Sequence, residues 1–235
     1  MKSNGHTAGL QWHALLTGEM LLFGLLGKLL YTYPDQDFLD TISEKGLFDD
    51  VPFAEEQTAV QQGLTYLQQW QTDQTALTPE ESLTQLRADY TRLFVGPSKV
   101  LAPLYESVHY GEERLTFQEA TLAVRHWYRR FGIEALNLHQ EPDDHIGLEL
   151  SFISHLAGRG LIALEQDNQP NMLAFLHAQR QFLNEHLLKW AFNWCALVEE
   201  HSQTDFYRGV AQLTRGALLE LRDHTLVDLP TGVPA

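Results

Sequence analysis

The chain has 235 residues, 44% of them hydrophobic, and a formal net charge of −15 at pH 7. A chain of this length and apolar content can bury a substantial core in one domain or two small ones. The negative charge argues against a nucleic-acid-binding protein, which needs a basic surface, and it favours a basic partner. The single cysteine, Cys195, excludes an internal disulfide and a site with several thiolate ligands.

The first expected element is a strongly apolar helix at residues 10–31. Glu19 and Lys28 interrupt its apolar pattern, and the uninterrupted stretch at residues 20–27 is too short to span a bilayer. No small-residue cleavage pattern follows it. Because leucines and Phe23 fall on nearly all sides, we predict a buried core helix in a cytoplasmic protein, with no stable membrane insertion.

Helical periodicity continues through almost the whole chain. The segment Thr78-Pro79-Glu80-Glu81 has the composition of a helix start, with a capping threonine, a proline and a glutamate three residues later. No run alternates apolar and polar residues long enough for a sheet, although residues 108–110 could be briefly extended. The sequence therefore predicts an all-α bundle of about nine helices. The other eight are expected near residues 36–45, 54–72, 79–94, 117–131, 142–158, 171–185, 187–200 and 205–223.

Two loops divide this pattern. Residues 96–115 lack a helical period, and loops of this length inside compact domains are usually functional. The second loop, at residues 133–141, predicts a larger N-terminal bundle at residues 1–135 and a smaller C-terminal bundle at residues 136–235. A hinge between two helical bundles can exchange elements between protomers, so a domain-swapped homodimer is a hypothesis.

The most informative segment is Glu141-Pro142-Asp143-Asp144-His145, directly in front of an apolar helical pattern. One interpretation is a well-capped helix, because proline and acidic residues are both favoured in a first turn. The other is a polar cluster at a helix N-terminus, where backbone N–H groups and side chains converge on a partner.

Three blocks in a fixed order carry a family resemblance. They are Tyr-Thr-Arg-Leu-Phe-Val-Gly-Pro at residues 90–97, Ala-Pro-Leu-Tyr-Glu-Ser-Val-His-Tyr at residues 102–110, and the motif at residues 141–145. With these blocks the chain resembles the TorD/DmsD family of redox-enzyme maturation chaperones over residues 15–221. The resemblance implies an all-helical cytoplasmic chaperone. Such a protein binds the twin-arginine leader, and a surface of the apo-form, of a molybdenum-cofactor oxidoreductase before export.

Signals for catalysis and metal binding are weak. Glu106-Ser107-Val108-His109 is the only Glu-x-x-His in the chain, whereas a di-iron bundle needs two. There is no His-x-x-x-His pair, nucleophile elbow or phosphate loop. His145 and Glu149 are four residues apart, which favours an intrahelical polar pair over a metal site. We therefore expect no catalytic residue, metal or cofactor; the alternative is a small helical metal- or nucleotide-dependent hydrolase.

A receptor for such a leader needs an apolar groove with acidic groups at one end. The expected polar end comprises Glu141, Asp144 and His145, with Glu106 and Ser107 nearby. Its carboxylates would accept hydrogen bonds from arginine, and His145 would orient a carboxylate or donate to a peptide carbonyl.

The candidates for the apolar groove are aromatic or apolar side chains, each of which could equally be ordinary core. The family resemblance favours five of them, and at one of these positions, Tyr90, some relatives have tryptophan. These five are Tyr31, Tyr90, Leu93, Phe94 and Pro103, and the other two candidates are Tyr33 and Trp127.

Overall fold

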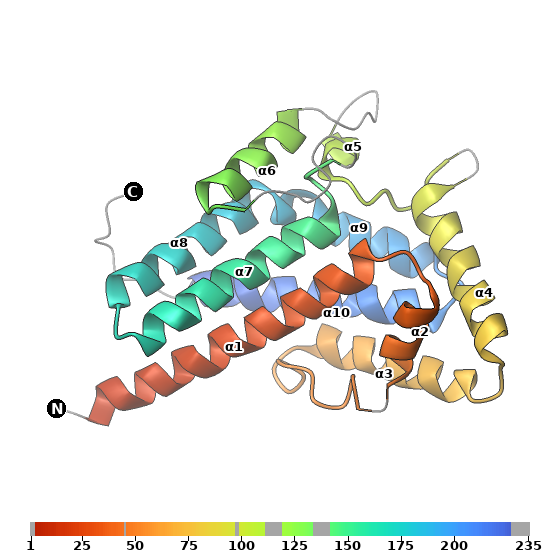
Figure 1. Cartoon of the computed structure of the whole chain (residues 1–235), viewed down its shortest axis with the longest axis horizontal. Helices are drawn as coiled ribbons and strands as arrows, with labels where there is room; N and C mark the ends of the chain where they lie inside the picture. Colours follow the sequence, from red (N-terminus) through yellow and green to blue (C-terminus); the bar gives the residue numbers. More distant parts are fainter. Residues whose placement is uncertain (1–2, 45, 97–98, 111–118, 134–141, 227–235) are drawn as a thin grey trace.

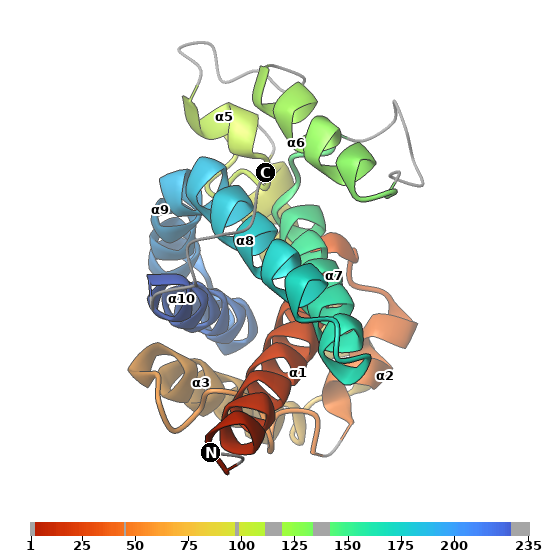
Figure 2. The same cartoon turned by 90° about the vertical axis from the view of Figure 1, so that its left-hand side faces the viewer.

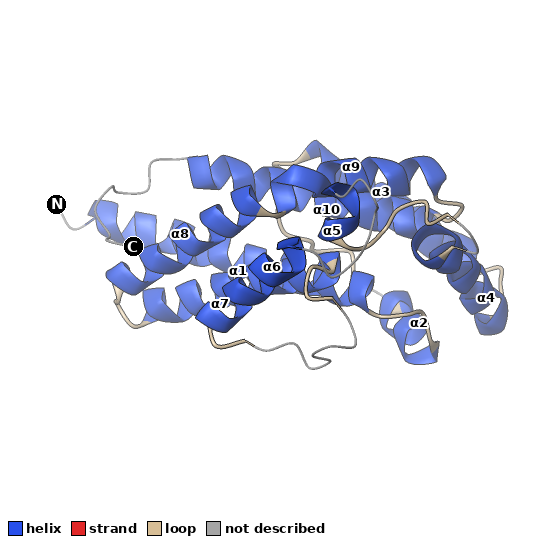
Figure 3. Ribbon diagram, turned by 90° about the horizontal axis from the view of Figure 1, so that it is seen from above, coloured by secondary structure: helices blue, strands red, loops and turns tan. Residues whose placement is uncertain are grey.

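A computed structural model describes residues 3–44, 46–96, 99–110, 119–133 and 142–226. Within these ranges the chain forms ten α-helices, one π-helix and no strand, and 78% of it is helical (Figure 3). The all-α prediction is confirmed. In chain order the elements are α1 (Ser3–Tyr31), α2 (Gln36–Ser43), α3 (Thr58–Gln74), α4 (Pro79–Tyr90), the π-helix η1 (Thr91–Val95), α5 (Glu106–Tyr110), α6 (Glu119–Arg130), α7 (Ile146–Glu165), α8 (Gln169–Glu185), α9 (Leu187–His201) and α10 (Asp205–Leu226).

The long helices form one bundle in which α1 runs along α7 and α3 runs along α10 (Figure 1). Helices α8 and α9 connect these two pairs, while α2 and α4 pack together at one end. Figure 2 shows α5 and α6 together at one edge of the bundle. Since the main core cluster draws residues from all of these elements except α5, the ranges 1–135 and 136–235 share one core. Their division into two bundles stays a prediction.

Helix α1 is apolar on most sides but lies at the outside of the bundle. Leu16, Leu22 and Leu26 are fully buried, whereas Leu10 and Leu21 are more than half exposed. The prediction that α1 is buried on all sides therefore holds only for the side of the helix that faces the bundle. By length and composition alone, the window Leu10–Tyr31 could cross a membrane, with a mean hydropathy of 1.5; half of it is buried against the rest of the chain.

The two main helix pairs approach closely because glycines face each other across them. A Cβ on Gly147 of α7 would lie 2.8 Å from the carbonyl oxygen of Gly27 in α1. A Cβ on Gly63 of α3 would lie 2.8 Å from the carbonyl oxygen of Gly209 in α10. At such distances only glycine lets the two backbones pack without moving apart.

The structure corrects several predicted boundaries. The helix expected at residues 79–94 ends at Tyr90 and continues as the π-helix, whose closing bond runs from the Gly96 N–H to the Thr91 carbonyl oxygen at 2.6 Å. Residues 108–110, for which the sequence left a brief extended stretch open, belong to the short helix α5. Helix α7 begins at Ile146 rather than at residue 142, because His145 is extended at its N-cap. The bridge between Tyr105 and His145 lies just before α5 and α7.

Candidate functional site

Asp144 fastens two helices to the start of α7. Its Oδ2 accepts the backbone N–H of Ser107 in α5 at 2.7 Å, and its Oδ1 accepts the hydroxyl of Thr121 in α6 at 2.7 Å. The side chain has no exposed surface. Both oxygens are thus engaged inside the protein, and the Ser107 bond explains why a helix starts at Glu106 inside a predicted loop.

His145 caps α7 instead of orienting Asp144. Its Nδ1 accepts the backbone N–H of Gly147 at 3.0 Å, which requires the hydrogen of a neutral ring to sit on Nε2. Burial lowers the pKa of His145 to about 3, so the ring is uncharged at neutral pH. Tyr31 and Tyr105 contact the ring edge-on, with centroids at 5.4 and 5.3 Å.

A polar hub lies beside this cap, and it comprises Glu106, Ser107, Asp144, Glu149 and His186, all at most 4% exposed. The Glu106 carboxylate contacts His186 Nδ1 at 2.8 Å. Neither oxygen of Glu149 makes a hydrogen bond of normal geometry, so the predicted pair with His145 does not form. Burial, together with the nearby carboxylates of Glu106 and Asp144, raises the pKa of Glu149 well above its usual value. Burial thus favours the protonated form of the Glu149 carboxyl group.

Asp143, next in the chain to Asp144, holds α6 in the same way. The Arg125 Nε donates to its carboxylate at 2.5 Å, and the Tyr128 hydroxyl donates to its backbone carbonyl at 3.0 Å. The acidic motif predicted at a helix start thus serves mainly to attach α5 and α6 to the bundle.

Three of the groove candidates lie in or beside an aromatic cluster at the end of α4 and in the π-helix. Tyr90, Leu93 and Phe94 are at most 8% exposed. The Tyr90 ring contacts Tyr33 and Phe94 at about 5 Å, and Phe94 stacks on Trp194 with centroids 6.2 Å apart. In this conformation they are core residues, which was the alternative interpretation.

The remaining candidates are spread over other elements. Trp127 in α6 is 7% exposed, and its Nε1 donates to Glu185 in α8 at 3.0 Å. Half-buried Pro103 lines a hollow of about 370 Å³ together with Lys99 and His109. Glu141 lies outside the described residues.

Backbone hydrogen bonds bring the three sequence blocks into one junction. The Ala102 N–H donates to the Leu93 carbonyl oxygen at 2.8 Å, which ties the second block to the π-helix. The Ile146 N–H donates to the Leu104 carbonyl oxygen at 2.8 Å, and the Glu106 N–H donates to that of Asp144 at 2.9 Å. Residues 102–106 therefore run between the π-helix and the start of α7.

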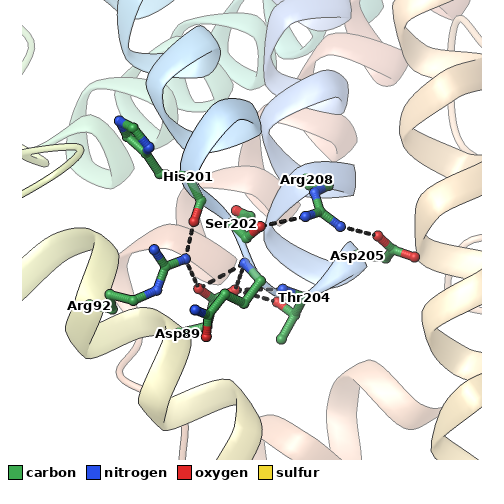
Figure 4. A network of polar contacts seen from close by, with 8 residues as sticks. Asp89, Arg92, His201, Ser202, Thr204, Asp205 and Arg208 are labelled. Carbon is green, nitrogen blue, oxygen red and sulfur yellow. Dashed lines mark hydrogen bonds and ion pairs between the residues drawn. The ribbon is translucent and has the colours of Figure 1, made fainter.

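A second anchor, which the sequence analysis missed, holds the other side of the π-helix (Figure 4). Buried Asp89 accepts the backbone N–H groups of Gln203 and Thr204, at the start of α10, at 2.8–3.1 Å. Arg92 donates to Asp89 at 2.9 Å and also to the carbonyl oxygen of His201. In the sequence, Asp89 and Arg92 are an acidic and a basic residue three positions apart, on either side of Tyr90. This spacing is equally typical of an ion pair on the surface of a helix, so it does not indicate a buried anchor.

Across the described part of the chain, no three His, Cys, Asp or Glu side chains gather closely enough to hold a metal ion. Cys195 is buried, and burial raises the pKa of its thiol to about 12, so it stays protonated at neutral pH.

Comparison with known proteins decides the family. Residues 54–196, which include all three blocks, match the family described as nitrate reductase delta subunit. The chain belongs to this family. The resemblance to the TorD/DmsD chaperones is confirmed as well, because relatives with these names align over much of their length.

The chain is 30% identical, over 212 residues, to the Tat proofreading chaperone DmsD of Salmonella typhimurium. That match covers 86% of this chain and 88% of the relative. It is 32% identical, over 133 residues, to the chaperone protein TorD of Aliivibrio salmonicida, covering 57% of this chain and 60% of the relative. A crystal structure of an Archaeoglobus fulgidus protein assigned to redox enzyme maturation superimposes with a TM-score of 0.48 at 22% identity, covering 84% and 92% of the two chains.

Proposed function

We propose that this protein is a cytoplasmic chaperone that binds the twin-arginine leader of a molybdenum-cofactor oxidoreductase and assists cofactor insertion before export. The observation that carries the proposal is the alignment with a Tat proofreading chaperone over 88% of that relative. The related proteins are named chaperones, so we propose a binding protein that catalyses no reaction and needs no cofactor. No relative supports the hydrolase alternative.

The charge of the chain supports this proposal. A net charge of −15 attracts a peptide with a basic front end and accelerates its encounter with the protein. We further propose that a surface of the apo-enzyme is bound, because a helical bundle of this size exposes far more area than one leader can cover.

The junction of the three blocks is the proposed leader site. Its polar residues would be Glu106, Ser107, Glu141, Asp144 and His145, and its apolar residues would be Tyr31, Tyr90, Leu93, Phe94, Pro103 and Trp127. Because most of these side chains are buried, a leader bound there has to replace contacts within the protein. An arginine guanidinium, for example, would take over the Asp144 oxygens from Ser107 and Thr121.

The substitution Asp144→Asn is a better test of this site than Asp144→Ala, because it preserves more of the folded structure. Alanine would leave the Ser107 N–H and the Thr121 hydroxyl without an acceptor, which costs about 1–3 kcal/mol for each buried group. Asparagine keeps the size and one acceptor but removes the charge. We expect leader affinity, measured by calorimetric titration, to fall about tenfold, the loss typical of a hydrogen bond to a charged group.

Two controls make this experiment decisive. Glu119→Gln removes a charge from the exposed first turn of α6 and should leave affinity unchanged. A panel of twin-arginine leaders, each with a scrambled version, tests the function itself. If no leader binds the unmodified protein better than its scrambled version, the proposed function is wrong. If leaders bind and Asp144→Asn has no effect, Asp144 lies outside the site.

A further inference from the structure

A cleft of about 650 Å³ is lined by α2, α3 and the first turn of α4, at the opposite end of α4 from Tyr90. We call it the α2–α4 cleft. Leu39, Trp70, Leu77 and Pro79 supply its apolar lining. A hollow of this size and character can hold one or two apolar side chains of a peptide.

Acidic residues surround the α2–α4 cleft. Asp40 and Asp49 line it and are exposed, and none of the described residues that line it carries a positive charge. From Asp35 to Glu81 the sequence has eleven acidic residues against Lys45 alone. A concave surface lined by charge of one sign concentrates counter-ions, so this one favours a cationic ligand.

The cleft also offers hydrogen-bond acceptors. Gln74 lines it, and its Oε1 is buried without a donor. Buried acceptors are rarely left in this state, and a guanidinium or a peptide N–H would satisfy the amide oxygen. The neighbouring Gln71 is already committed, because its Nε2 donates to the Ile42 carbonyl oxygen at 3.2 Å.

The carboxylate of Asp144 in the polar hub already has hydrogen-bond donors inside the protein, whereas the carboxylates of the α2–α4 cleft are accessible. Both oxygens of Asp144 accept hydrogen bonds inside the protein. In the cleft, the one hydrogen bond that Asp40 accepts from a described residue comes from the exposed side chain of Gln36, within α2, at 2.8 Å. An arginine can therefore reach the cleft carboxylates without breaking a buried network.

We propose that the α2–α4 cleft binds a cationic peptide segment through an apolar anchor, and that this segment is the basic front end of the twin-arginine leader. The inference rests on the proposed function and adds a second contact region to it, for those basic side chains of the leader that do not reach Asp144. Asp40 and Asp49 bind the basic side chains, while an adjoining apolar residue packs on Leu77 and Pro79, the accessible apolar side chains of the cleft.

The decisive experiment is a double-mutant cycle on the full chain. It measures binding of a twin-arginine leader peptide, and of the same peptide with its arginines replaced by glutamine, to the unmodified protein and to Asp40→Asn/Asp49→Asn. Exposed charge pairs are individually weak, so we expect the double variant to lose about three- to tenfold affinity for the charged leader. It should bind the neutral leader as the unmodified protein does, and 0.5 M salt should remove the difference.

A matched control distinguishes binding of the leader by the cleft carboxylates from attraction of the leader by the overall negative charge of the protein. Glu119→Gln/Glu200→Gln removes the same charge from exposed positions on α6 and α9, and it should change affinity for the charged leader by less than twofold. If this control loses as much affinity as the cleft variant, or if the cleft variant loses affinity equally for both peptides, the inference is wrong while the proposed function stands. If no leader binds the unmodified protein, both fail.

Thiol protection gives an independent readout. Cys195 is buried and protonated, so a thiol introduced by Ser43→Cys at the exposed edge of the cleft is alkylated selectively. The leader should slow this alkylation several-fold and leave Glu200→Cys unaffected. Protection by an apo-oxidoreductase without its leader, but not by the leader, would identify the enzyme surface as the occupant and overturn the inference.

Discussion

Buried carboxyl groups in this protein fall into two classes, set by their immediate partners. Asp89 and Asp144 accept several N–H or O–H donors, which satisfy both oxygens of each carboxylate and let these residues serve as anchors. Glu19 and Glu149 are equally buried but have fewer donors, since Glu19 accepts a hydrogen bond from Gln179 and Glu149 accepts none of normal geometry. Burial raises the pKa of both carboxyl groups. Residue type alone would not separate these roles.

Glu19 should make stability depend on pH. Burial, opposed by a hydrogen bond from Gln179 at 3.0 Å, raises its pKa from 4.5 to about 7, and Glu220 adds to the rise. The folded protein keeps this proton between pH 4.5 and 7 while the unfolded chain loses it. Stability is thus lost as pH rises through this window, by about 2–3 kcal/mol in total.

Glu19→Gln removes this penalty and keeps the acceptor for Gln179. Urea unfolding at pH 8 should therefore show a variant about 2 kcal/mol more stable than the unmodified protein, while at pH 4.5 the two should nearly coincide. Glu200→Gln, which changes the same charge at an exposed site, should show no such difference. A Glu19→Gln variant less stable at both pH values would contradict the argument.

At the scale of elements, glycine contacts decide how closely helices pack. In Gly63→Ala, the new Cβ meets the backbone of α10 at 2.8 Å, both at the Gly209 oxygen and at the Leu213 nitrogen. Backbone atoms of a packed helix cannot turn aside, so α3 must shift. We expect a loss of about 1–3 kcal/mol in the free energy of unfolding.

Gly158→Ala in α7 is the matched control. Its Cβ meets only the side chain of Met20, at 3.1 Å from the sulfur, and a methionine side chain can move aside. This control should be neutral or slightly stabilising, since alanine is the better helix former. Equal losses in the two variants would show that helix spacing is not what glycine provides at Gly63.

The same scale explains the main errors of the sequence analysis. A helical period alone does not distinguish an α-turn from the π-turn at residues 91–95. Asp89 and Arg92 attach this region to the connection between α9 and α10, which is far away in the sequence. Helix α5 was likewise unpredictable from residues 106–110, since its first N–H groups are capped by Asp144, distant in sequence.

At the scale of the whole molecule, each half of the chain packs on the other. Helix α1 runs along α7, and α3 along α10, so the contacts between residues 1–135 and 136–235 are extensive. A second copy of the chain could supply α7–α10 to the first with the same contacts. The hinge proposed for such an exchange is the loop at residues 133–141, of which residues 134–141 lie outside the described part of the chain.

A domain-swapped homodimer is therefore predicted at high protein concentration, because the swap replaces contacts within a chain by identical ones between chains. Size-exclusion chromatography with light scattering should show a dimer that returns to monomer slowly after dilution, since exchange requires the halves to separate. A monomer at every concentration would contradict the prediction.

The sequence by itself determined the all-α class, most helix positions and the family, because these depend on periodicity, capping residues and ordered local blocks. One of its two interpretations of the acidic motif, a helix cap, agrees with the position of His145 at the N-cap of α7. Only the tertiary structure decided which carboxylates are internal anchors, that the candidate aromatics are buried, and that the available acidic groups face an apolar hollow at the α2–α4 cleft. The accessibility of a side chain and its hydrogen-bond partners depend on contacts between segments that are far apart in the chain. The pattern of residues along one segment therefore does not predict them.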